Sequence, residues 1–246
     1  MENSLLYPVN SASRRAVSLD GMWKFRFDPE SAGLAAGWTQ ALPDPVSMPV
    51  PSSFCDLFTD KDSREYCGDF WYETDFFVPG EWQGSDVVLR FGSVTHRARV
   101  FVNGVEVASH EGGFLPFNAD VTDVVRYNAR NRLTVLGNDE LYEYTLPAGR
   151  TSVLKNGKKV AAPYFDFYNY AGIQRPVKLL RLPKERITDF SVNHRLCGAD
   201  AQVDYTVTTN GGSDCTVEVY DADGRKVAAG TGKAGTLNIS NARLWD

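Results

Sequence analysis

The sequence has few residues of the kinds that bind metals or polyanions. Its 246 residues include three histidines and four cysteines without a Cys-x-x-Cys pair, and the net charge is -5 with no run of lysine or arginine. Proteins bind nucleic acids and anionic membranes through clustered positive charge, and structural zinc needs clustered ligands. The sequence therefore argues against nucleic acid and membrane partners, and we expect no metal and no cofactor.

Long apolar runs are also absent. No run approaches the length of about 18 residues that a membrane-spanning helix needs, and residues 1–15 contain no apolar stretch of signal-peptide length. We therefore expect a cytoplasmic protein with free thiols, although four cysteines would allow two disulfides in an oxidising compartment.

Short stretches in which apolar and polar residues alternate occur along the whole chain. Such period-two runs, interrupted by Gly, Asn, Asp and Pro, indicate strands with one buried face. Asn103-Gly104 lies between two of these runs, and because both residues tolerate a positive φ, the pair predicts a tight hairpin turn. The predicted fold class is all-β. The clearest runs are residues 22–27, 87–91, 98–102 and 132–136.

The length of the chain suits two domains. A charged, proline-containing connector at residues 181–186 separates aromatic-rich strands from smaller ones, so we predict domains at residues 1–182 and 183–246. An immunoglobulin-like sandwich needs about seven strands in about 100 residues, and we therefore expect the second domain to be incomplete. Its expected strands are residues 187–192, 201–208 and 215–220, and a turn is expected at 221–224 before residues 226–228.

Several motifs carry a family resemblance. Residues 92–104 read GSVTHRARVFVNG, followed by HEGGF at 110–114 and PFNADVT at 116–122; upstream lie LDGMWKF at 19–25, VPSSF at 50–54 and WY at 71–72. In this order they resemble the sugar-binding jelly-roll domain of glycoside hydrolase family two. The run YFDFYNYAGIQR at 164–175 is similar to β-glucuronidases rather than to the β-galactosidases or β-mannosidases that share the architecture.

The resemblance covers most of residues 10–182 and implies a jelly-roll, galactose-binding-like β-sandwich. From residue 187 onward the chain is similar to the immunoglobulin-like β-sandwich that precedes the catalytic barrel in those enzymes. The implied parent is a bacterial enzyme and a homo-oligomer. It hydrolyses β-D-glucuronides with retention, through two glutamates on a C-terminal barrel.

No catalytic residue is expected in this chain. A (β/α)₈ barrel takes about 250 residues of alternating strands and helices, and such alternation does not occur here. Both catalytic glutamates, and the barrel elements that bind the β-D-glucuronide substrate, are therefore expected outside these residues. We predict that the 246-residue chain alone is inactive.

The resemblance assigns one substrate-binding residue to this chain. In β-glucuronidases an aspartate just before the Asn-Tyr-Ala-Gly run reaches the sugar from the jelly roll, and the matching residue is Asp166. A carboxylate accepts charge-assisted hydrogen bonds from hydroxyl groups, and these are about twice as strong as neutral ones. The alternative is that Asp166 caps a turn.

Five aromatic residues occupy seven positions around Asp166. They are expected to dock onto the barrel or to stack on a sugar, and we favour docking because so many exposed rings are costly in water. The residues assigned to docking are Phe165, Phe167, Tyr168, Asn169 and Tyr170, with Tyr164 beside them. Asn169 is also expected to satisfy backbone groups of the loop, and Arg175 to form an ion pair.

The remaining polar residues are expected to be structural. His96 and His110 are interpreted as hydrogen-bonded strand histidines, because no nucleophile motif accompanies them. Glu111 precedes a Gly-Gly bend, and residues 149–162 are expected to form a flexible loop near the active-site rim.

Two further functions remain open. A non-catalytic carbohydrate-binding module should show two or three exposed, coplanar aromatic rings on one sheet face. An assembly module would make no sugar contact. An accessory domain of a glycosidase should instead show an apolar patch around residues 164–170.

Overall fold

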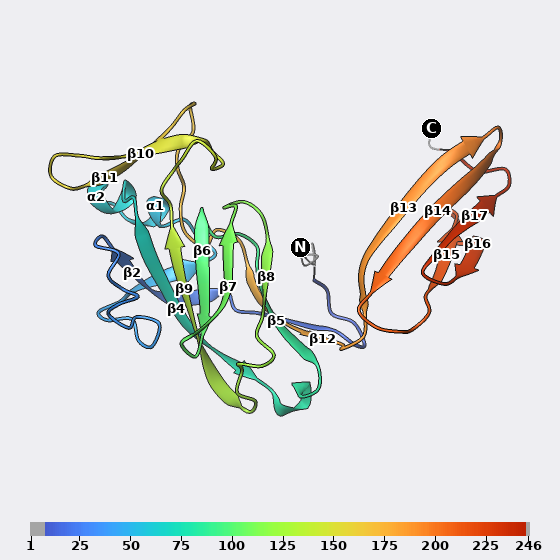
Figure 1. The fold of residues 1–246 in the computed structure, drawn as a ribbon, viewed down its shortest axis with the longest axis horizontal. Coiled ribbons are helices and arrows are strands. Elements are labelled where there is room, and N and C mark those ends of the chain that lie inside the picture. Colours follow the sequence, from blue (N-terminus) through green and yellow to red (C-terminus); the bar gives the residue numbers. More distant parts are fainter. Residues whose placement is uncertain (1–7, 245–246) are drawn as a thin grey trace. The chain divides into compact units, whose positions relative to one another are not determined.

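The computed structural model describes residues 8–244 (Figure 1). Nearly all of its regular elements are β-strands, so the predicted all-β class is confirmed. The chain divides into two compact units between Leu182 and Pro183. In the described part of the chain, no helix has the length and apolar character needed to cross a membrane.

The first unit is built from two antiparallel sheets. One has the strand order β3-β2-β4-β9-β6-β7 and the other β1-β12-β5-β8, and β10 and β11 form a separate pair. The elements are β1 (Arg15–Ser18), β2 (Gly21–Asp28), β3 (Val46–Val50), α1 (Phe54–Leu57), α2 (Lys61–Arg64), β4 (Asp69–Val78), the 3₁₀ helix η1 (Gly80–Trp82), β5 (Asp86–Phe91), β6 (Arg97–Val102), β7 (Val105–Glu111), β8 (Phe117–Asp120), β9 (Ala129–Asn138), β10 (Gly149–Val153), β11 (Lys159–Pro163) and β12 (Val177–Leu182).

The main core lies between these two sheets. In β6, Ala98, Val100 and Val102 are buried, and so is Phe101, while Arg97 and Arg99 are partly exposed. The facing sheet contributes Leu89 from β5 and Leu179 from β12 to the same core. The period-two pattern of the sequence thus reflects one buried face per strand.

A second, smaller core covers part of the outer face of the six-stranded sheet. Phe101 of β6 stacks on Trp71 of β4 with ring centroids 6.1 Å apart, and Leu42 and Leu136 complete the cluster. The segment between β2 and β3 is held there by buried Asp28, whose carboxylate accepts hydrogen bonds from the N–H groups of residues 32 and 33 and from Trp71 Nε1.

The predicted hairpin turn at Asn103-Gly104 is confirmed. The two residues have φ of 52° and 85°, and Val102 of β6 pairs with Val105 of β7 across them. Positive φ at both central residues matches the right-handed twist of the flanking strands, which is why Asn-Gly is favoured here.

The expectation of a flexible loop at residues 149–162 is corrected by the structure. This segment is a β-hairpin in which Gly149 of β10 pairs with Pro163 of β11, and Val153 pairs with Lys159. An ion pair between Lys158 and Asp62, at 2.7 Å, ties its turn to α2. The strands were not evident because a two-stranded ribbon without a buried face shows no apolar alternation.

The second unit has five strands among its described residues. They are β13 (Ile187–Cys197), β14 (Asp200–Thr209), β15 (Thr216–Tyr220), β16 (Lys226–Thr231) and β17 (Ala234–Ile239), arranged as the sheets β13-β14-β17 and β15-β16. The predicted strands are confirmed, and Asp221 begins the predicted turn before β16. Its core contains Tyr205, Val207 and Leu237.

The inner side of β13 is only partly covered within the described part of the second unit. Phe190 and Val192 pair directly opposite the buried residues Val207 and Tyr205, and opposite residues of an antiparallel pair share one face. Phe190 and Val192 are nevertheless 70% and 54% exposed. That the second domain is incomplete stays a prediction.

Candidate functional site

The predicted site residues lie on one exposed segment, residues 164–170, which we call the aromatic loop. It connects β11 to the chain that leads into β12. Its five aromatic side chains are 38% to 59% exposed, although rings of this size usually lie in cores or interfaces. An apolar patch is therefore present around residues 164–170. These side chains are Tyr164, Phe165, Phe167, Tyr168 and Tyr170.

The rings of the aromatic loop do not form a flat platform. Phe165 and Phe167 are inclined by 52° to each other, and Tyr168 and Tyr170 by 53°. They lie on a loop rather than on a sheet face. This geometry differs from the coplanar rings expected of a carbohydrate-binding module and favours burial against another protein surface.

Asp166 is exposed at the centre of the aromatic loop. Within the described residues its carboxylate forms no hydrogen bond and no ion pair, so the alternative role of capping a turn is not observed. An exposed carboxylate without an internal partner is free to accept hydrogen bonds from an external ligand.

Asn169 anchors the aromatic loop to the sandwich. Its Nδ2 donates a hydrogen bond to the backbone carbonyl of Asp139 at 3.0 Å, and its Oδ1 lies 2.6 Å from His96 Nε2. Its own carbonyl accepts a hydrogen bond from the Cys55 thiol at 3.7 Å. Asn169 was expected to satisfy backbone groups of its own loop, and it bonds instead to a backbone carbonyl outside that loop. Its assignment to domain docking stays a prediction.

The two histidines near the loop are held by the fold. His96, directly before β6, is 2% exposed, and burial lowers its pKa because the charged imidazolium is poorly solvated there. His110 of β7 stacks on Phe117, with ring centroids 4.3 Å apart, and its Nε2 lies 3.1 Å from the carbonyl oxygen of Gly112. His110 matches the expectation of a hydrogen-bonded strand histidine, whereas His96 is hydrogen-bonded as expected but precedes the strand.

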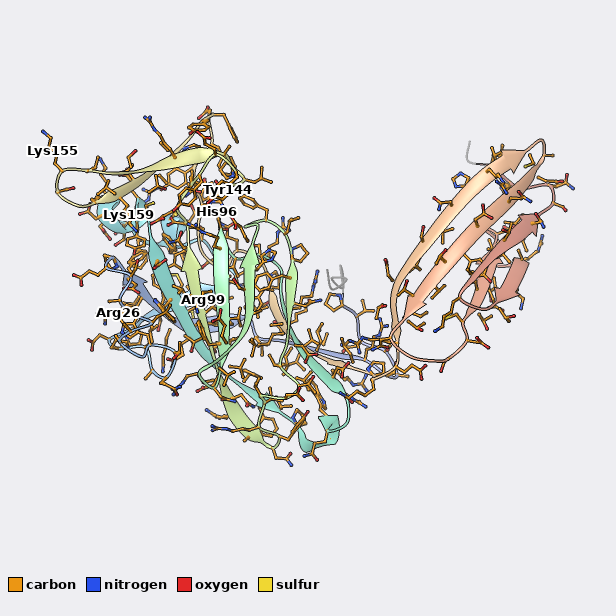
Figure 2. All side chains as sticks on the ribbon, viewed as in Figure 1. Arg26, His96, Arg99, Tyr144, Lys155 and Lys159 are labelled. Carbon is orange, nitrogen blue, oxygen red and sulfur yellow. The ribbon has the colours of Figure 1, made fainter. Side chains whose placement is uncertain are left out.

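An apolar pocket of about 420 Å³ adjoins the aromatic loop. It lies between residues 112–115 and residues 144–146, and His96 and Glu111 also line it. Phe114 in its wall contacts Phe167, with ring centroids 6.3 Å apart and the rings perpendicular. Figure 2 shows His96 and Tyr144 at the same end of the six-stranded sheet, with Lys155 farther out on the β10–β11 hairpin.

Asp139 is a buried carboxyl group that the sequence did not reveal. It follows β9 and is 1% exposed, and its Oδ1 accepts a hydrogen bond from the N–H of Gly68 at 2.7 Å. Burial raises its pKa to about 7, and the nearby carboxylates of Glu140 and Asp69 add to the effect. An aspartate after a strand usually indicates a turn, so no pattern pointed to its burial.

The ion pair expected for Arg175 is absent from the described residues. Its guanidinium Nη1 instead donates a hydrogen bond to the carbonyl of Phe114 at 3.1 Å. Arg175 therefore holds the wall of the apolar pocket rather than balancing a carboxylate. Across residues 8–244, no group of three or more His, Cys, Asp and Glu side chains is placed to hold a metal ion.

The chain matches a known family over most of its first unit. Residues 16–183, more than half of the chain, match the family described as glycosyl hydrolases family 2, sugar binding domain. The chain belongs to glycosyl hydrolase family 2. The predicted resemblance to the jelly-roll domain of this family is thereby confirmed.

This family 2 chain is similar over its whole length to β-glucuronidases. A solved structure of the Ruminococcus gnavus β-glucuronidase is 53% identical, with a TM-score of 0.94, and the match covers 100% of this chain and 41% of that one. The β-glucuronidase of Paenibacillus borealis is 41% identical over 98% of this chain and 42% of its own length. The β-glucuronidase of Canis lupus familiaris is 40% identical over 100% of this chain and 41% of its own length.

The family 2 chain thus spans about two fifths of the length of these relatives. The Ruminococcus gnavus enzyme has also been solved in complex with uronic isofagomine and with D-glucaro 1,5-lactone.

Proposed function

We propose that this chain is the N-terminal part of a retaining β-glucuronidase. The observation that carries the proposal is the 53% identity to the Ruminococcus gnavus β-glucuronidase across the entire chain, with a TM-score of 0.94. Complexes of that enzyme with compounds of uronic acid type support glucuronides as the substrate class. The two glutamates that such hydrolysis needs belong, in this proposal, to a barrel outside the 246 residues.

Asp166 is the residue through which this chain touches the sugar. Its carboxylate is exposed and has no partner among the described residues, and the loop that carries it is anchored by Asn169. A charged hydrogen bond of this kind contributes about 1.5–3 kcal/mol, which corresponds to roughly a tenfold to hundredfold change in affinity.

The aromatic loop docks the first unit onto the barrel. Its rings are inclined to one another and exposed in this chain, which suits a surface that becomes buried when a further domain packs against it. Phe165→Ser in the full-length protein should lower the unfolding temperature, whereas the same change in the 246-residue chain should have little effect. Phe77→Ser is a matched control, because Phe77 is exposed to a similar extent on β4.

Hydrolysis of 4-nitrophenyl β-D-glucuronide tests the proposal directly. We expect activity from the full-length protein expressed from the complete gene, no activity from the 246-residue chain, and much weaker activity of the full-length protein on the matching β-D-galactoside. Activity of the short chain would contradict the assignment of catalysis to a barrel outside it. Lack of activity in a folded full-length protein would contradict the substrate class.

Asp166→Ala in the full-length protein tests the proposed contact between Asp166 and the sugar. We expect a fall in kcat/KM of about tenfold to hundredfold, with an unfolding temperature close to that of the unchanged protein because the side chain has no partner among residues 8–244. Unchanged kinetics would show that Asp166 does not contact the substrate.

A further inference from the structure

The backbone of the aromatic loop has few contacts with the rest of the fold. Tyr164 N–H donates to the carbonyl of Ala148 at 3.0 Å. Residues 171–173 are buried, and the carbonyls of Ala171 and Ile173 accept hydrogen bonds from the N–H groups of Phe54 and Ser52. Between these points, the N–H groups of residues 165–169 donate to no other described residue. The position of Asp166 therefore depends on side-chain anchors.

The Asn169 side chain, three residues after Asp166, anchors the loop to two separate parts of the fold. One end of its amide reaches Asp139, directly after β9, and the other reaches His96, directly before β6. Because β6 and β9 are neighbours in the six-stranded sheet, both contacts hold the loop to the same part of that sheet. Tyr168, whose hydroxyl donates to the carbonyl of Arg64, is held to the short helix α2 instead.

The carbonyl of Asp139 determines which end of the Asn169 amide donates and, in turn, which nitrogen of His96 carries the proton. The Asp139 carbonyl only accepts, so the NH₂ end of the Asn169 amide must face it, and Oδ1 must face His96. His96 Nε2 therefore carries the proton. His96 Nδ1 has no hydrogen-bond partner in the described part of the chain and lies against Gly113, where an added Cβ would approach it to 2.7 Å. The ring is thus a neutral donor fixed in place on both sides.

We propose that Asn169 is a positioning residue for Asp166, held in its orientation by the His96 ring and the Asp139 carbonyl. This inference rests on the proposed function, in which Asp166 contacts the sugar. Removing the Asn169 side-chain amide keeps the Asp166 carboxylate but no longer holds it at a fixed position relative to the sheet. Small displacements of a binding group weaken its contacts strongly, because its hydrogen bonds depend on geometry.

A double-mutant cycle in the full-length protein tests the proposal. Asn169→Ala should lower kcat/KM on 4-nitrophenyl β-D-glucuronide about tenfold, mainly through a higher KM, because two hydrogen bonds of the loop are lost. In the Asp166→Ala background the same change should have less than about a threefold effect, because a residue that acts through Asp166 loses its influence when Asp166 is absent.

Two variants of His96 keep the test independent of folding. His96→Gln retains an N–H donor for Asn169 Oδ1 and should keep kcat/KM within about threefold, whereas His96→Ala should reproduce the effect of Asn169→Ala. Asn156→Ala is the matched control, because Asn156 lies in the turn of the β10–β11 hairpin and its side chain, among residues 8–244, bonds only to the N–H of Lys158. Unfolding temperatures identify any variant whose loss of activity comes from the fold.

The outcomes separate the two proposals. If Asp166→Ala has no effect on kcat/KM, the role given to Asp166 is wrong, and the positioning role falls with it. If Asp166→Ala weakens activity but the Asn169→Ala effect is equally large in both backgrounds, the substrate contact stands and the positioning role is refuted. A folded His96→Gln variant as impaired as His96→Ala would also contradict it.

Discussion

The buried carboxyl group of Asp139 should make the stability of the first unit depend on pH near neutrality. Its pKa is raised from an ordinary 3.8 to about 7. A carboxyl group with a higher pKa in the folded state binds more protons when folded than when unfolded. Its contribution to stability is therefore fully present below about pH 4 and is lost as the pH rises through 7.

The size of the effect follows from the difference between the two pKa values. It corresponds to about 4 kcal/mol between acidic and mildly alkaline solution, because charging the group in a site that is 1% exposed is costly. Asp139→Asn removes the charge and keeps an oxygen for the Gly68 N–H. The new side-chain NH₂ group is a buried donor and offsets part of this gain. The variant should therefore be about 2–4 kcal/mol more stable than the unchanged chain at pH 8.

Thermal unfolding of the 246-residue chain at pH 5 and pH 8, followed by circular dichroism, measures the effect. At pH 8 we expect Asp139→Asn to unfold roughly 5–10 °C higher than the unchanged chain. At pH 5 its stability advantage should be smaller by about 2–3 kcal/mol, because Asp139 is then protonated in the folded chain and mostly charged in the unfolded one. Asp75→Asn, at an exposed position of β4, should show no such dependence. An equal difference at both pH values would refute the reasoning, because the carboxyl would then not change its charge in this range.

Two further substitutions test other parts of the fold by urea denaturation. Asp28→Ala should destabilise the first unit by about 3–5 kcal/mol, because three donors, two of them buried, lose their acceptor; a loss below about 1 kcal/mol would show that the segment after β2 is held by other contacts. Gly113→Ala should cost about 1–3 kcal/mol, because the added Cβ would lie 2.7 Å from His96 Nδ1. Gly212→Ala, with nothing within 4 Å, should be nearly neutral, and equal effects of the two glycine changes would contradict the packing argument.

Local features of the fold could be predicted from the sequence. The alternation along β6 follows from one buried face, and the Asn103-Gly104 turn follows from residues that tolerate positive φ. In contrast, β10 and β11 have no buried face of their own, so their sequence carries no alternation that distinguishes a strand from a loop.

The sequence predicts less of the candidate site than of the fold. Asp166 and its aromatic neighbours were proposed from resemblance, and the exposed patch is present in the structure. The contact between His96 and Asn169 joins residues 73 positions apart, and the burial of Asp139 depends on Gly68, 71 positions away. Such long-range contacts come from the pairing of distant strands, and no local pattern in one sequence encodes them.

The N–H groups of residues 165–169 donate to no other described residue, and this has a consequence for motion. The aromatic loop is able to leave the sandwich without the breaking of any strand-to-strand hydrogen bond, so its opening costs far less free energy than unfolding of the first unit. Amide hydrogens of these residues should exchange with solvent long before those of β6 and β9. The loop is therefore a local unit that side chains such as Asn169 tie to the sheets, and in the proposed docking a partner surface can pack against it without disturbing the sheets beneath it.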